Sequence, residues 1–268
     1  MYHSVYFSYR PGASAIDSRL KGITRNSWTD FYMIPSTRPV INPPKVRTNY
    51  TELAGAFGQL DFTDVLTGYP LYNTRTGSLE FIVDNGHEEW YDIYSSIMSW
   101  VHGKKMYMVL EDEIDWYYTG RMSVNSWKSE QHNSKIQIDY ELDPFKYYIN
   151  DTNTDWIWDT FNFESGVTYS DIFKSIEVDG ELIIPLYGCI GNKPSTPKFI
   201  VSDSNQGLSI EYINTHLGLS VRDTFENGEH IDTNYVFYDP GYSVSDSDLY
   251  LKIVGTGKLS IVFHPAKL

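Results

Sequence analysis

Short runs in which apolar and polar residues alternate recur along the chain, and they limit its fold more than any other feature. The runs 5–9 and 79–83 follow this period of two and are bounded by turn-forming residues. Such alternation over about four to eight residues is typical of a β-strand with one buried face. Further runs of this kind in the first half are 46–50, 106–110, 116–118, 122–127 and 136–140. We therefore expect a mainly β protein.

One segment departs from this period and has the spacing of an amphipathic helix. Its apolar residues are Trp90, Ile93, Tyr94, Ile97, Met98 and Val101. Asn85 can cap its start, with Glu88 completing a capping box, and Gly103 is a typical stop. We predict one α-helix over about 86–102, packed on a sheet through this apolar face.

The second half contains only short strand-like runs separated by turn signals. The polar stretch 150–155 suggests a boundary, which divides the chain into domains 1–147 and 148–268. The expected strands are 156–163, 182–186, 198–201, 208–213, 235–238, 249–254 and 259–263. The expected turns are 179–180, 227–228, 240–241 and 255–257. This regular punctuation favours a C-terminal β-sandwich.

Charge and cysteine content exclude several classes of protein. The formal net charge of -14 argues against tight nucleic-acid binding, which needs a cationic surface. The one cysteine, Cys189, allows no intrachain disulfide and is expected in the core. No signal peptide or membrane-spanning run is recognisable, so we expect synthesis and folding in a cytoplasm. The 22 tyrosines suit half-exposed sheet faces and interfaces.

Asp61 and Asp64 form the strongest catalytic candidate, a carboxylate pair of the kind that glycosidases use. The competing interpretation is that the segment GQLDFTDVLTGYPLYNTR is a turn-rich connector whose polar groups bind local backbone. We favour the connector and expect no enzyme activity. The seven histidines have no metal-ligand spacing, and no cofactor motif is present, so no metal or cofactor is expected.

Three aromatic residues of the second half are candidates for a sugar-binding platform: Trp156, Trp158 and Tyr187. Trp156 and Trp158 are two residues apart on an expected strand and would share a face. The alternative for both is a place in the core or in an interface.

A series of motifs over residues 1 to about 145 resembles the N-terminal domain of distal tail (Dit) proteins of long-tailed phages. In order along the chain they are WTDF at 28–31, PVINPPK at 39–45, GQLDFT at 58–63, LTG at 66–68, YNTR at 72–75, the helix with Trp90, HGK at 102–104, YYTGR at 117–121 and DPF at 143–145. The sequence departs from the family before Gly58, where a Pro-Gly-like turn is common.

The resemblance implies a structural virion protein at the phage tail tip, made in the bacterial host's cytoplasm. N-terminal domains would form a hexameric ring with a lumen for DNA passage, without specific DNA binding or membrane insertion. A galectin-like C-terminal sandwich would follow. The ring would join the tail tube to the hub or tail-associated lysin, and receptor-binding proteins are further possible partners. The positions carried over from the family are Trp28, Gly58, Asp61, Thr63, Gly68, Arg75, Trp90, Gly103, Gly120 and Arg121.

Two other functions stay open on the sequence. A carbohydrate-binding module for host adhesion would use the C-terminal sandwich. A glycan-degrading enzyme would use Asp61 and Asp64.

Overall fold

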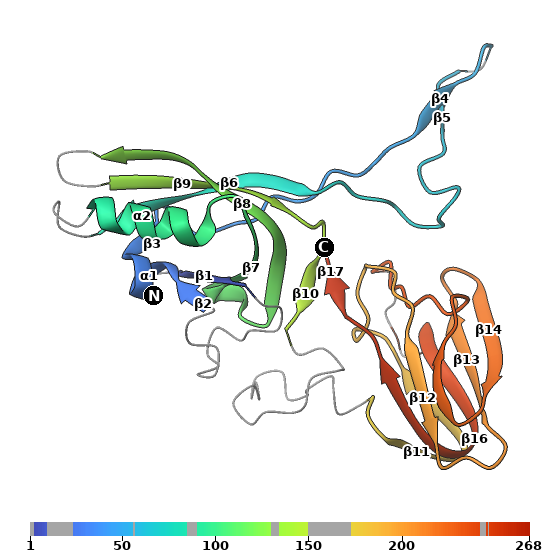
Figure 1. Cartoon of the computed structure of the whole chain (residues 1–268). Helices are drawn as coiled ribbons and strands as arrows, with labels where there is room; N and C mark the ends of the chain where they lie inside the picture. Colours follow the sequence, from blue (N-terminus) through green and yellow to red (C-terminus); the bar gives the residue numbers. More distant parts are fainter. Residues whose placement is uncertain are drawn as a thin grey trace. The chain divides into compact units, whose positions relative to one another are not determined.

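The structure is a computed structural model, and it describes residues 3–9, 24–55, 57–84, 90–129, 134–149, 173–241, 245 and 247–268. The chain is mainly β and divides into two compact units, residues 1–149 with Leu268 and residues 150–267 (Figure 1). Each unit has its own hydrophobic core.

The first unit is built on one antiparallel sheet with the strand order β2-β1-β7-β8-β9-β6-β3, and β10 also pairs with β8. A separate hairpin, β4–β5, lies outside this sheet. The strands are β1 Val5–Ser8, β2 Thr24–Asn26, β3 Met33–Pro35, β4 Tyr50–Glu52, β5 Gln59–Asp61, β6 Arg75–Val83, β7 Lys104–Leu110, β8 Trp116–Ser129, β9 Ser134–Leu142 and β10 Lys146–Tyr148. The helices are α1 Ser27–Phe31, α2 Trp90–Val101 and the 3-10 turn η3 Glu111–Glu113.

Helix α2 confirms the predicted helix over its described part, Trp90–Val101. Trp90, Ile97 and Val101 are buried in the first core, and Ile93 packs against it. The helix contacts β7 and β8, so the apolar stripe read from the sequence does face the sheet. Gly103 follows with φ +72°, the left-handed conformation that favours glycine after a helix. The predicted cap, Asn85 with Glu88, lies outside the described residues.

The short helix α1 was not anticipated, although its capping signal is present in the sequence. The Asn26 side chain accepts hydrogen bonds from the amides of Trp28 and Thr29, at 2.7 and 3.1 Å. The Asp30 carboxylate in turn accepts from the Asn26 amide at 2.8 Å. This reciprocal arrangement satisfies N–H groups that a helix start leaves unpaired. Five residues are too few to show a helical period, and only the cap identifies the helix.

The second unit is a β-sandwich whose strands form one continuous hydrogen-bonded network. Their order is β14-β13-β16-β12-β15, and β11 lies along the other edge of β16. The strands are β11 Ile176–Pro185, β12 Lys198–Ser202, β13 Leu208–Asn214, β14 Leu219–Phe225, β15 Gly228–Ile231 and β16 Leu249–Val262. The short strand β17, Ala266–Lys267, is not part of this network.

Strand β16 corrects two predictions. The sequence predicted strands 249–254 and 259–263 with a turn at 255–257, but one strand of 14 residues runs through these glycines. Its first half pairs with β13 and its second half with β12, so it belongs to both halves of the sandwich. A Cβ at Gly255 or Gly257 would lie 3.0 Å from the carbonyl oxygen of Gly207 or Ser202. Here glycine permits close backbone packing inside a strand that continues from one half to the other.

The turn predicted at Asp179–Gly180 is also wrong, because both residues lie inside β11 and pair with Thr256 and Gly255 of β16. The turn predicted at Asn227–Gly228 is confirmed between β14 and β15. The run 235–238 forms only an isolated bridge, Ser195 to Phe237. The run 156–163 lies outside the described residues.

Candidate assembly surface

The segment from Lys45 to Tyr72 forms an arm that extends beyond the end of β6 (Figure 1). At its base two extended segments run side by side. The Arg47 amide donates to the Leu71 carbonyl oxygen and the Asn73 amide to that of Lys45, both at 2.8 Å. Further out, β4 and β5 pair over three residue pairs. All six residues of these strands are exposed, so the hairpin is not buried against the sheet of its own unit.

The arm is rich in exposed apolar side chains. Among the described residues, it holds nine of the eighteen large hydrophobic residues that are exposed. Phe57 and Leu66 are the extremes, with relative exposures of 109% and 95%. The nine are Val46, Tyr50, Leu53, Phe57, Leu60, Phe62, Val65, Leu66 and Leu71. Soluble monomers rarely expose large contiguous apolar patches, and those that do usually bind a partner there.

The connector inside the arm is shaped by local hydrogen bonds. The Asp61 carboxylate accepts from the Thr63 amide at 2.9 Å and from the Thr63 hydroxyl. These bonds, the hydroxyl first, hold the pKa of Asp61 below its ordinary value. The Thr63 hydroxyl also accepts from the Asn49 amide at 3.1 Å, which ties the two sides of the arm together. Asp61 is therefore an ionised turn-forming group, which is the opposite of a general acid.

Two glycines of the connector have positive φ. The values are +87° for Gly58 and +74° for Gly68, and an added Cβ would meet nothing within 4 Å at either. Backbone conformation is therefore the reason for glycine here, whereas crowding plays no part. The Gly68 amide donates to the Asp64 carbonyl oxygen at 2.8 Å, so the main chain of Asp64 also belongs to this turn.

Arg75 anchors the root of the arm from inside the first unit. Its guanidinium is buried, with Nε donating to the Pro144 carbonyl oxygen at 2.8 Å and Nη1 to that of Asn42 at 3.2 Å. The Tyr118 ring lies 5.7 Å away. Burial lowers the pKa of Arg75, while attraction to Tyr118, Tyr140 and Glu113 opposes that shift. One arginine thus fixes where the chain leaves the sheet and where it returns.

The other positions carried over from the family lie in the body of the first unit. Trp28 is half-buried in α1 and contacts Tyr32 edge to face, whereas Trp90 is buried at the start of α2. Gly120 lies so close to β9 that a Cβ would be 2.1 Å from the Glu141 carbonyl oxygen. Next to it, Arg121 donates to the carbonyl oxygen of Gly103. Gly103, Gly120 and Arg121 therefore come together, while Trp28, Trp90, Arg75 and the arm residues occupy other places.

The acidic turn η3 joins distant segments, a role that the sequence did not indicate. The Glu111 carboxylate accepts from the Ser4 amide at 2.6 Å. Asp112 accepts from His3 Nδ1 at 2.9 Å and from Arg38 Nε at 2.8 Å. Glu113 contacts the Tyr118 hydroxyl at 3.2 Å and Lys146 Nζ at 2.8 Å. The three carboxylates therefore bind the residues just before β1, the proline-rich segment (residues 35–44), β8 and β10.

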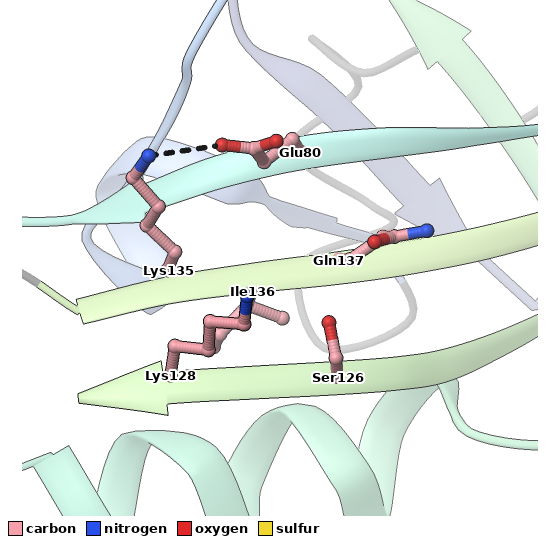
Figure 2. A pocket seen from close by; sticks show the side chains of 6 residues that line it. All are labelled: Glu80, Ser126, Lys128, Lys135, Ile136 and Gln137. Carbon is pink, nitrogen blue, oxygen red and sulfur yellow. Dashed lines mark ion pairs between the residues drawn. The ribbon is translucent and has the colours of Figure 1, made fainter.

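The outer face of the sheet carries two small hollows that share Glu80. One, of about 140 Å³, lies over β6, β8 and β9 and is lined by Glu80, Ser126, Lys128, Lys135, Ile136 and Gln137 (Figure 2). Within it, Lys135 Nζ lies 3.4 Å from Glu80 Oε1. The other, of about 220 Å³, lies between the proline-rich segment and β6.

Catalytic and metal-binding interpretations gain no support from the described part of the chain. It contains no group of three His, Cys, Asp or Glu side chains that could hold a metal ion. Of the candidate sugar-facing aromatics, Tyr187 is exposed, whereas Trp156 and Trp158 lie outside the described residues. Cys189 is half-buried beside the second core. Among the described helices, none is long and apolar enough to cross a membrane.

Among solved structures, the chain is similar to the Dit protein of phage SPP1, described as a paradigm of the hub adsorption apparatus in phages that infect Gram-positive bacteria. The TM-score is 0.53 and the identity 13%, over 88% of this chain and 94% of that chain. A chain of the phage P2 baseplate, in its activated conformation with Ca, aligns over 98% of this chain and 95% of that one at 10% identity. Its TM-score of 0.33 is too low to carry an argument.

No protein-family model matches the chain, and no curated protein sequence is significantly similar to it. The fold therefore rests on the structural comparison and on the element order given above. The chain has the fold of the SPP1 Dit protein, and the resemblance to distal tail proteins is confirmed at that level.

Proposed function

We propose that this chain is a structural protein of a long-tailed phage that assembles head to tail into a hexameric ring at the distal end of the tail. Unit 1 forms the ring, and unit 2 is a galectin-like sandwich. The ring joins the tail tube to the hub or tail-associated lysin, and DNA passes through its lumen. The protein accordingly belongs to the virion and has no catalytic role. The shared fold with the SPP1 Dit protein supports this proposal.

The observation that carries the proposal is the exposed apolar arm. An isolated two-stranded hairpin is at best marginally stable in water. The β4–β5 hairpin has no buried face, and the arm that contains it carries Phe57 and Leu66 fully open to solvent. Both costs disappear when the arm packs on another surface, since burial of apolar area is the main favourable term in association. A second copy of the chain can supply such a surface, and the arm and that surface are then always present in equal numbers.

We infer that the arm of one copy binds a different patch on the next copy and that this contact is not returned, which makes it heterologous. Such a contact repeats from copy to copy and gives a closed ring where the rotation between copies closes, whereas two copies that exchanged arms reciprocally would form a two-fold dimer.

The test measures the mass of the purified protein by light scattering, with negative-stain images of the same sample. We expect a closed ring for the wild type and a folded monomer for the triple variant Phe57→Ser, Val65→Ser, Leu66→Ser. A matched control replaces three exposed apolar residues elsewhere, Tyr91, Ile183 and Ile231, with serine. This control keeps the ring. A wild type that stays monomeric at all concentrations contradicts the proposal, as does a ring that the arm variant leaves intact.

A further inference from the structure

The hollow between residues 35–40 and β6 has a mixed lining, in which Pro35, Pro39 and Val40 supply apolar surface beside polar side chains. Its walls come from Pro35, Thr37, Arg38, Pro39 and Val40 on one side and from Ser78, Leu79 and Glu80 of β6 on the other. Val40, at its rim, is 69% exposed. The volume of about 220 Å³ exceeds the roughly 150 Å³ of an apolar cavity that binds benzene. A phenyl ring therefore fits.

This hollow exists because the proline-rich segment is hydrogen-bonded to β6 at Glu80 and again at Thr76, and is open between these two points. At one end the Ser36 amide donates to the Glu80 carbonyl oxygen at 2.9 Å. At the other end Asn42 Nδ2 donates to the Thr76 carbonyl oxygen at 3.0 Å, and the Asn42 amide to the Tyr140 hydroxyl at 3.0 Å. Prolines on a sheet edge prevent a further strand from pairing there. A side chain can still enter where a strand cannot.

The arm carries a matching side chain but cannot bring it to its own hollow. The arm leaves β6 at Arg75, and the hollow lies three to five residues further along the strand, about 10–16 Å into the sheet. The arm extends the other way, by about 25 Å from Lys45 to Glu52 at strand rise. Phe57 lies beyond that point, between β4 and β5. Phe57, out on the arm, and the hollow, beside the middle of β6, are therefore well apart in one unit, and a contact between them needs a second copy of the chain.

Charge favours the same pairing. Residues 48–70 of the arm contain three carboxylates, Glu52, Asp61 and Asp64, and no Lys, Arg or His. The acceptor side has Lys128 and Lys135 in the adjoining hollow of Figure 2, whereas Arg38 at the hollow is already paired with Asp112. Those two lysines are direct cross-strand partners, an arrangement that is unfavourable without a neutralising anion. Glu80 supplies one carboxylate against the two lysines, so a net positive charge remains there.

We propose that Phe57 at the tip of the arm of one copy inserts into the Pro35–Pro39–Val40 hollow of the next copy, with the carboxylates of the arm beside Lys128 and Lys135. This inference rests on the proposed self-assembly and names its contact. Phe57 is the anchor, since buried aromatic side chains in pockets dominate interface energies.

The contact is tested by disulfide trapping in a Cys189→Ser background, where introduced cysteines are the only thiols. Two single-cysteine proteins, Phe57→Cys and Val40→Cys, are mixed under mild oxidation. We expect a disulfide-linked dimer between the two variants, and none when Tyr91→Cys replaces Val40→Cys. A double variant with both cysteines gives a ladder on a non-reducing gel that ends at the number of copies in the ring.

A second variant tests the same contact without oxidation, in case oxidation itself perturbs the ring. Val40→Asp places a charge on the rim of the hollow at an exposed position, so the fold survives. It weakens assembly at least tenfold, whereas Tyr91→Asp does not. If the wild type assembles but 57 and 40 do not cross-link and Val40→Asp assembles normally, this contact is wrong and the ring proposal stands. If the wild type does not assemble at any concentration, both fail.

Discussion

Large apolar side chains are exposed to solvent in the arm but buried in the second unit. In the second unit, Phe199, Phe225, Tyr235 and Phe237 are buried, with Phe199 5.2 Å from Tyr235 and 5.3 Å from Phe225 between ring centroids. In the arm, Phe57 and Leu66 contact water. One chain suffices to complete the aromatic core, whereas the arm lacks a covering surface of its own. The difference indicates which apolar residues serve folding and which serve assembly.

The largest effect that tests this comparison comes from truncating one phenylalanine in each region. Phe237→Ala removes a fully buried ring that contacts Tyr212 and Phe263. We expect the free energy of unfolding to fall by about 3–5 kcal/mol. Phe57→Ala removes an exposed ring and changes the stability of the monomer by less than about 0.5 kcal/mol. Urea unfolding of both variants under dissociating conditions measures this, and equal losses would refute the division between folding and assembly residues.

An intermediate effect is expected at the junction between arm and sheet. Arg75→Ala removes two charge-assisted hydrogen bonds and leaves the carbonyl oxygens of Pro144 and Asn42 without this donor. We expect a loss of about 2–3 kcal/mol and an arm that is cleaved faster by protease at its root. Arg222→Ala is the control, because that arginine is exposed and belongs to the second unit. Unchanged cleavage in Arg75→Ala would mean that other contacts fix the root.

The smallest effect concerns pH and the acidic turn. The hydrogen bond from His3, followed by the Arg38 contacts, holds the pKa of Asp112 below its ordinary 3.8. A carboxylate with a lowered folded-state pKa stabilises the fold above its unfolded pKa, and this stability is lost as pH falls through the folded pKa. We expect the unfolding temperature of the wild type to fall below about pH 4, and Asp112→Asn to flatten that fall.

Thermal unfolding of both proteins between pH 2 and 7 measures this effect, at fixed ionic strength because the group is near the surface. The two proteins differ at this one position, so the difference between the two curves isolates Asp112. Parallel curves would show that the contacts of Asp112 with His3 and Arg38 add nothing to stability.

Local pattern determined much of the fold. The apolar stripe of α2, the alternation of β6, β7 and β9 and the Asn227–Gly228 turn all involve residues that are close in sequence, so periodicity and turn chemistry reveal them. The connector interpretation of the segment from Gly58 to Arg75 was also available, because Asp and Thr two residues apart commonly bind local backbone. The short α1 could have been found from its cap, Asn26.

Other features depended on residues distant in the chain. Gly255 and Gly257 read as a turn, and only packing against Gly207 and Ser202 shows that β16 continues through them. Nothing near Arg75 in the sequence indicates Pro144 as its partner.

The sequence by itself therefore determined the helix α2 and the approximate places of most of the longer strands, and that the chain resembles distal tail proteins. Only the tertiary structure decided that the apolar residues of the arm stay exposed while similar residues of the sheets are buried. The physical reason is that burial depends on which surfaces the fold brings together. An alternating run has the same sequence pattern whether its apolar face packs on the core of its own unit or stays exposed until another protein surface covers it.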